Sequence, residues 1–172
     1  MTYLHEALTK KVTEWRESNY SCQDFPSIRE ILEYATENTN DGMYRYLRSA
    51  QFKALEIYWY LRLVENTPKV PQLYERLFPM ARERRTAMGL TSDEIRDYLE
   101  DESWDALYQK IRTDNAFVRR NHLESLRETL TLDYPSYILA LAMGAGKTIL
   151  MATIVATEFA MAQWLNFRPI TI

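Results

Sequence analysis

One glycine-rich stretch, Gly-Ala-Gly-Lys-Thr at 144–148, separates two apolar stretches of the 172-residue chain. The first apolar stretch, 137–141, is short and flanked by turn-forming residues, as is typical of a strand buried on both faces. The second, 149–165, is long enough to form a helix of several turns. Because glycine tolerates positive φ angles, the stretch predicts a tight turn between a strand and a helix.

A strand, such a loop and a helix together predict a site for nucleotide phosphates. The amides from Gly144 through Ala145 and Gly146 are expected to bind phosphate oxygens, helped by the positive end of the helix dipole. Lys147 is expected to reach the β- and γ-phosphates, and the Thr148 hydroxyl to bind the Mg²⁺ that bridges them. The loop therefore predicts the phosphates of a nucleotide and Mg²⁺ as ligands.

The strict pattern of such loops places another glycine at position 141, where this chain has Leu141. An ordinary glycine-rich turn between a strand and a helix is the alternative interpretation. Lys147 favours the phosphate site, because a lone cation in so apolar a segment needs an anionic partner.

Composition and charge narrow the classes of protein further. The net charge of −3 gives no general attraction to nucleic acid. The single Cys22 excludes an internal disulfide framework and suits a reducing compartment. The first residues, 1–6, lack the basic and apolar regions of a signal peptide. We therefore expect a cytoplasmic protein.

The apolar stretch 149–165 has nearly the length of a membrane span. Glu158 and Gln163 interrupt it, and Lys147 directly precedes it. A helix that follows a phosphate loop is normally buried by its neighbours, so apolar residues on all sides are expected. We predict no membrane insertion, and a membrane-tethered helical domain is the weaker alternative.

The density of charge changes near residue 132. Charged residues are frequent before it, and only Asp133, Lys147, Glu158 and Arg168 follow. We therefore predict a helical N-terminal region at 1–131 and a separate strand–loop–helix unit at 132–172. In the latter we expect a strand at about 136–142, a helix at about 147–165 and a possible second strand at 168–172.

Helical spacing of apolar residues and cap signals predict the elements of the first region. A turn is expected at 38–42, a kink at Pro79, and a helix end at Gly89. The helices are expected at about 4–15, after Pro26, at 43–65, 72–88, from Asp93 onward, at 104–112 and at 115–130.

Three stretches resemble the N-terminal part of superfamily 2 DEAD/DEAH-box helicase-type ATPases, with the Res subunit of type III restriction enzymes as the closest likeness. The first, Leu-Arg-Ser-Ala-Gln-Phe-Lys-Ala-Leu-Glu at 47–56 with Tyr-Trp-Tyr-Leu-Arg at 58–62, is similar to the element that precedes motif I. The second, Met-Gly-Ala-Gly-Lys-Thr at 143–148, is similar to motif I itself. The third, 149–153, fits the helix that follows.

The resemblance implies a mainly helical chain followed by the first strand, phosphate loop and helix of an incomplete RecA-like α/β domain. It implies ATP as the nucleotide: Gln51 recognises adenine, Lys147 binds the phosphates and Thr148 binds Mg²⁺, with Gly144 and Gly146 shaping the loop. It also implies a DNA partner for the full-length parent protein. The spacing between Gln51 and the loop implies a helical insertion at about 66–130.

The chain departs from this family because no acidic motif II follows the loop, and no second RecA-like domain, arginine finger or nuclease site is present. We therefore predict a truncated, N-terminal ATP-binding part of a DNA helicase or translocase that is not catalytically competent alone. The alternative is a non-enzymatic helical interaction module, whose apolar C-terminal segment docks on a protein partner or drives self-association.

Overall fold

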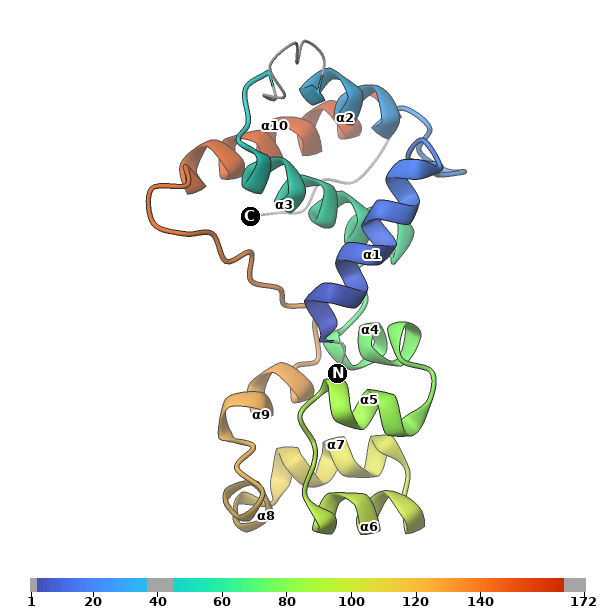
Figure 1. Ribbon diagram of the computed structural model, residues 1–172, viewed down its shortest axis with the longest axis vertical. Coiled ribbons are helices and arrows are strands. Elements are labelled where there is room, and N and C mark those ends of the chain that lie inside the picture. Colours follow the sequence, from blue (N-terminus) through green and yellow to red (C-terminus); the bar gives the residue numbers. More distant parts are fainter. Residues whose placement is uncertain (1–2, 37–44, 166–172) are drawn as a thin grey trace. The chain divides into compact units, whose positions relative to one another are not determined.

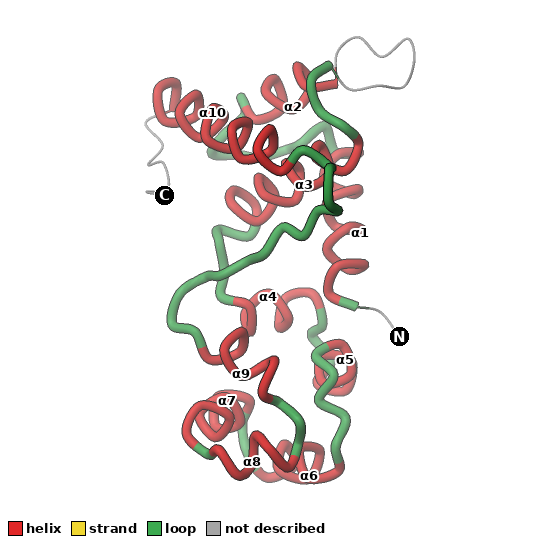
Figure 2. The backbone as a smooth tube through the Cα atoms, turned by 90° about the vertical axis from the view of Figure 1, so that its left-hand side faces the viewer, coloured by secondary structure: helices red, strands yellow, loops and turns green. Residues whose placement is uncertain are grey.

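The computed structural model describes residues 3–36 and 45–165. Every regular element in these residues is a helix (Figures 1 and 2). The turn expected at 38–42 and the strand expected at 168–172 lie outside the described residues. The elements are α1 (Leu4–Glu17), α2 (Ile28–Thr36), α3 (Ser49–Trp59), the π-helical turn η1 (Tyr60–Val64), α4 (Val70–Leu77), α5 (Ala81–Ala87), α6 (Asp93–Asp101), α7 (Trp104–Thr113), α8 (Asn115–Arg120), α9 (Glu124–Thr131) and α10 (Lys147–Leu165).

The predicted strand at 136–142 is wrong. These residues run as an irregular segment, and Ile138 is 91% exposed. A strand exists only where a neighbouring strand satisfies its backbone amides and carbonyls, and no strand occurs among the described residues. The predicted fold class is therefore corrected: the described part of the chain is all helical and contains no first strand of a RecA-like α/β domain.

The chain forms two compact units that alternate along the sequence. The first unit comprises Met1–Leu8 and Thr67–Tyr137, and the second comprises Thr9–Asn66 and Ile138–Ile172. The segment interpreted as a helical insertion, about 66–130, thus lies almost entirely in the first unit. The second unit joins the two stretches that carry the helicase resemblance, since 47–62 and 143–153 both belong to it.

Helices α4 to α9 build the first unit around a core of apolar side chains from α6, α7, α8, α9 and their connections. Ser92, Ser103 and Asp114 cap the starts of α6, α7 and α8, each by accepting a hydrogen bond from a backbone amide of the first turn. The most deeply buried members of this core are Leu90, Ile95, Leu107, Ile111, Phe117 and Leu123.

Two helices predicted in this unit are each broken into two. The helix expected at 72–88 with a kink at Pro79 is interrupted completely at Phe78–Met80, since Pro79 has no amide hydrogen to donate within a helix. Gly89, at φ 75°, ends the second half as predicted. The helix expected at 115–130 is interrupted around His122, which adopts a φ of 53°.

The second unit is organised around α3, whose residues Phe52, Leu55 and Trp59 are almost fully buried. The Glu56 carboxylate, 0% exposed, joins α3 to α1. It accepts hydrogen bonds from the Arg16 guanidinium at 2.7 and 2.5 Å and from the Tyr20 hydroxyl at 2.7 Å. Helix α10 packs on α3 from the other end of the sequence.

Candidate phosphate-binding loop

The predicted loop precedes α10, which begins at Lys147 as expected. Gly144 and Gly146 adopt φ angles of 76° and 79°, in the left-handed region that favours glycine. The Ala145 amide donates to the Ala142 carbonyl at 3.2 Å and is therefore already engaged within the loop. The Gly146 carbonyl accepts from the amide of Ile149 at 3.1 Å, which closes the first turn of the helix.

Two side chains of the α3 region hold the loop by its carbonyl oxygens. Arg48 Nη1 donates to the Gly144 carbonyl at 3.0 Å, and Gln51 Nε2 donates to the Gly146 carbonyl at 2.8 Å. The structure thus brings together two sequence motifs that are 95 residues apart. Arg48 was not among the predicted site residues, although it belongs to the same short motif as Gln51.

With these carbonyls tied to α3, several loop amides keep no protein partner. Among the described residues, none accepts a hydrogen bond from the amides of Gly144, Gly146, Lys147 or Thr148. The side chains of Lys147 and Thr148 are exposed. Unpaired amides, a cation and the start of a 19-residue helix together form a favourable environment for a polyphosphate anion.

Gln51 lies against the loop in a different manner from the one that adenine recognition requires. Its side chain is 1% exposed, and its Oε1 accepts from the Arg48 backbone amide at 2.6 Å while its Nε2 bonds Gly146. Both ends of the carboxamide therefore face the protein. The adenine-binding role of Gln51 stays a prediction.

Glu158 anchors α10 to α3 and the following turn. This carboxylate, 3% exposed, accepts from the Tyr58 hydroxyl and, at 3.1 Å, from Arg62 Nε. Burial raises the pKa of the Tyr58 hydroxyl, and its hydrogen bond to Glu158 raises it further. Trp59 Nε1 adds a hydrogen bond to Thr157 Oγ1 at 3.1 Å. This cluster was missed from the sequence, although an acid within an apolar helix signals a buried partner.

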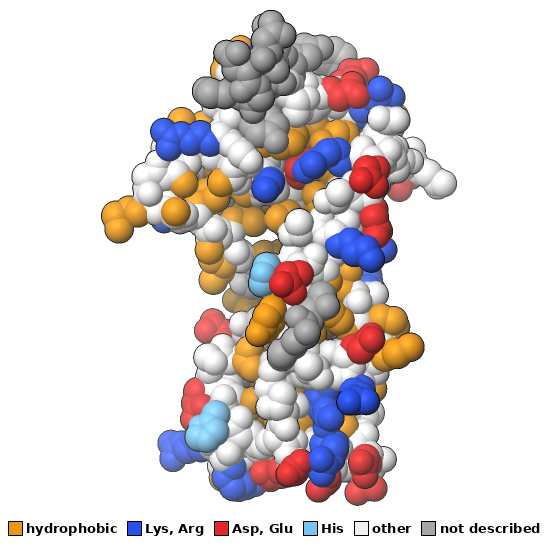
Figure 3. Space-filling view, in the orientation of Figure 1, with side chains coloured by type: hydrophobic (Ala, Val, Ile, Leu, Met, Phe, Trp, Pro, Cys, Tyr) orange, Lys and Arg blue, Asp and Glu red, His pale blue; other side chains and the backbone are white. Residues whose placement is uncertain are grey.

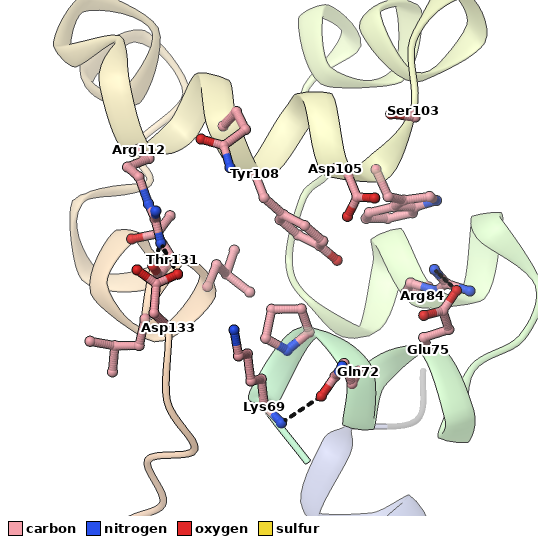
Figure 4. Close-up of a pocket in the computed structure, with 15 residues that line it drawn as sticks. Lys69, Gln72, Glu75, Arg84, Ser103, Asp105, Tyr108, Arg112, Thr131 and Asp133 are labelled. Carbon is pink, nitrogen blue, oxygen red and sulfur yellow. Dashed lines mark hydrogen bonds and ion pairs between the residues drawn. The ribbon is translucent and has the colours of Figure 1, made fainter.

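The first unit contains a separate cavity of about 670 Å³ (Figure 4). Tyr108 points into it from α7, while Arg112 turns to Asp133, at 2.8 Å. Arg84 approaches Glu75 at 3.5 Å on another wall. The lining holds as many acidic as basic side chains, so no net charge selects an anionic or a cationic ligand.

Comparison with known proteins gives no match to a protein family, to a curated protein or to a solved structure. None of the helices in the described ranges has the length and apolar character that crossing a membrane requires. In the same ranges, no three His, Cys, Asp or Glu side chains gather to hold a metal ion. A functional assignment therefore rests on the loop and the helices that support it.

Proposed function

We propose that this chain binds a Mg²⁺-nucleoside triphosphate through 144–148, as the N-terminal ATP-binding part of a DNA helicase or translocase of the type III restriction Res-subunit type. The observation that carries this proposal is the arrangement of the loop. Arg48 and Gln51 bond two of its carbonyl oxygens, while four of its amides and the exposed side chains of Lys147 and Thr148 are available to a ligand. Lys147 would contact the phosphates and Thr148 the Mg²⁺.

The helicase part of the proposal rests on the resemblance of 47–62 and 143–153. These stretches meet in one unit, through the bonds of Arg48 and Gln51 to the loop. Contact with DNA is proposed only for the full-length parent protein, because the net charge of −3 offers no general attraction to a polyanion.

We further propose that these 172 residues do not turn over ATP. Phosphoryl transfer depends on groups that position the attacking water and the metal. Glu158 is the only carboxylate side chain that follows the loop, and it is buried against Arg62 and Tyr58. It is therefore occupied in holding α10 and is not available to a metal or a water.

Replacing Lys147 by alanine is expected to weaken Mg-ATP binding at least about tenfold, because a charge-assisted contact to phosphate is lost. Isothermal titration calorimetry of both proteins measures the difference. Lys10→Ala, at an exposed position of α1 in the same unit, is the matched control and should bind as the wild type does. Equal affinities of the Lys147→Ala and Lys10→Ala variants would remove the phosphate role, and ATP turnover that Lys147→Ala abolishes would refute the absence of catalysis.

Exposed apolar side chains on α10 favour a second candidate function, self-association as a non-enzymatic interaction module. Ile149, Met151 and Phe159 are 51%, 65% and 65% exposed. Figure 3 shows hydrophobic side chains on the visible face of this unit, over the loop and the start of α10. Exposed apolar side chains gathered on one element favour an interaction site.

For this second candidate, sedimentation velocity of the wild type is expected to show oligomers at micromolar concentration. Phe159→Ser should shift the distribution toward the monomer, while Lys147→Ala and added Mg-ATP should leave it unchanged. A wild-type chain that sediments as a monomer throughout would eliminate the interaction module, and dissociation by ATP would link association to the loop instead.

A further inference from the structure

Both the oxygen and the nitrogen of the Gln51 carboxamide form hydrogen bonds within the protein. Reading adenine requires its oxygen and nitrogen to face one base edge together, with one accepting from N6 and the other donating to N7. Here the oxygen bonds the Arg48 amide at 2.6 Å and the nitrogen bonds the Gly146 carbonyl at 2.8 Å. With 1% of the residue exposed, a base edge reaches the carboxamide only if the Gln51 side chain moves.

The same contacts place Gln51 where it fixes the shape of the loop. A Cβ atom added to Gly146 would lie 2.4 Å from Gln51 Nε2, so the side chain packs directly on the loop backbone. The Gly146 carbonyl also accepts hydrogen bonds from the amides of Ile149 and Leu150 in the first turn of α10, at 3.1 and 3.3 Å. The Gly146 carbonyl is thus bonded both to Gln51 and to the first turn of α10, the helix whose N-terminal amides are proposed to bind the phosphates.

We infer that Gln51 is a positioning residue for the phosphate loop and not a reader of the base, so that the site accepts nucleoside triphosphates irrespective of their base. This inference rests on the proposed nucleotide function and specifies its ligand class. The polyphosphate is recognised by the amides of Gly144, Gly146, Lys147 and Thr148 and by the side chains of the last two residues. The purine makes no contact that distinguishes adenine from guanine through Gln51.

Calorimetric titration of the wild type with Mg-ATP, Mg-GTP and Mg-tripolyphosphate tests the inference. We expect the affinities for ATP and GTP to agree within about twofold, since a bidentate base contact would separate them by about tenfold or more. Tripolyphosphate is expected to compete with both nucleotides. This comparison needs no substitution and therefore does not depend on how a variant folds.

Two variants separate positioning from base reading. Gln51→Ala removes both bonds, whereas Gln51→Glu keeps an acceptor for the Arg48 amide and loses the donor to Gly146. Both should weaken ATP and GTP binding by the same factor, about tenfold, because the loop loses the bond that shapes it. Circular dichroism confirms that the helices of each variant are retained.

The outcomes are distinct. A wild-type preference for ATP over GTP of about tenfold or more, lost in Gln51→Ala with GTP binding unchanged, would overturn the positioning role while leaving the nucleotide function intact. Failure of the wild type to bind ATP, GTP or tripolyphosphate would instead defeat the proposed nucleotide function, and the inference with it.

Discussion

Glu158→Ala is expected to lower the free energy of unfolding by about 3 kcal/mol, the largest effect of any single substitution considered. The carboxylate, 3% exposed, is bonded by Arg62 Nε at 3.1 Å and by the Tyr58 hydroxyl. Its removal takes an acidic partner at 3.1 Å away from the Arg62 guanidinium, whose side chain is only 17% exposed. Breaking a largely buried ion pair costs more free energy than losing a neutral hydrogen bond. Chemical denaturation followed by circular dichroism measures the change.

The matched control is Glu33→Ala on α2, in the same unit. Glu33 pairs with Arg29 at 2.6 Å, but the two side chains are 46% and 51% exposed. An exposed pair contributes less than about 1 kcal/mol, so this variant should unfold almost as the wild type does. Similar losses in both variants would show that the Glu158 cluster does not hold α10 on α3.

Gly146→Ala is expected to weaken Mg-ATP binding about tenfold more than Gly144→Ala. Both glycines adopt positive φ angles, so alanine brings backbone strain of about 1–2 kcal/mol at either position. Only at 146 does the new Cβ also meet a neighbour, Gln51 Nε2 at 2.4 Å, whereas nothing lies within 4 Å at 144. Gln51 must then move and lose its bond to the loop. Calorimetric titration of both variants measures the difference.

A double variant checks the cause of this difference. In a Gln51→Ala background the clash partner is absent, so adding Gly146→Ala should weaken binding only as much as Gly144→Ala does. Substitutions in direct contact are generally non-additive, which makes this coupling measurable. If the losses of Mg-ATP affinity in Gln51→Ala and Gly146→Ala were additive, the effect of Gly146→Ala would come from backbone strain alone. That result would contradict a role for the contact with Gln51.

Local signals in the sequence were sufficient for helix α10 and for the turn that precedes it in the candidate site. Helix α10 spans Lys147–Leu165, as its apolar character predicted, and both loop glycines have the positive φ expected of them. The association of Gln51 with this loop followed from a resemblance between motifs, and the two do meet in the structure. What Gln51 contacts there was not predictable, since it depends on the exact approach of α3.

Features that depend on contacts between residues far apart in the sequence were not predictable from local signals. The apolar run at 137–141 has the composition of a strand, but strand formation needs a neighbour to bond with, and the described residues supply none. The break at His122, φ 53°, has no proline or glycine to signal it. The pairing of Arg62 with Glu158 joins residues 96 positions apart, a distance at which helical periodicity carries no information.

The most direct test of the central claim, that 144–148 forms a phosphate site supported by α3, is a ¹H–¹⁵N NMR titration of the chain with Mg-tripolyphosphate. We expect saturable chemical-shift changes at the amides of Gly144, Gly146, Lys147 and Thr148, whose hydrogen atoms have no acceptor among the described residues. The amides of 67–137 should not respond. Saturation with no change at 144–148, or changes confined to 67–137, would contradict the claim.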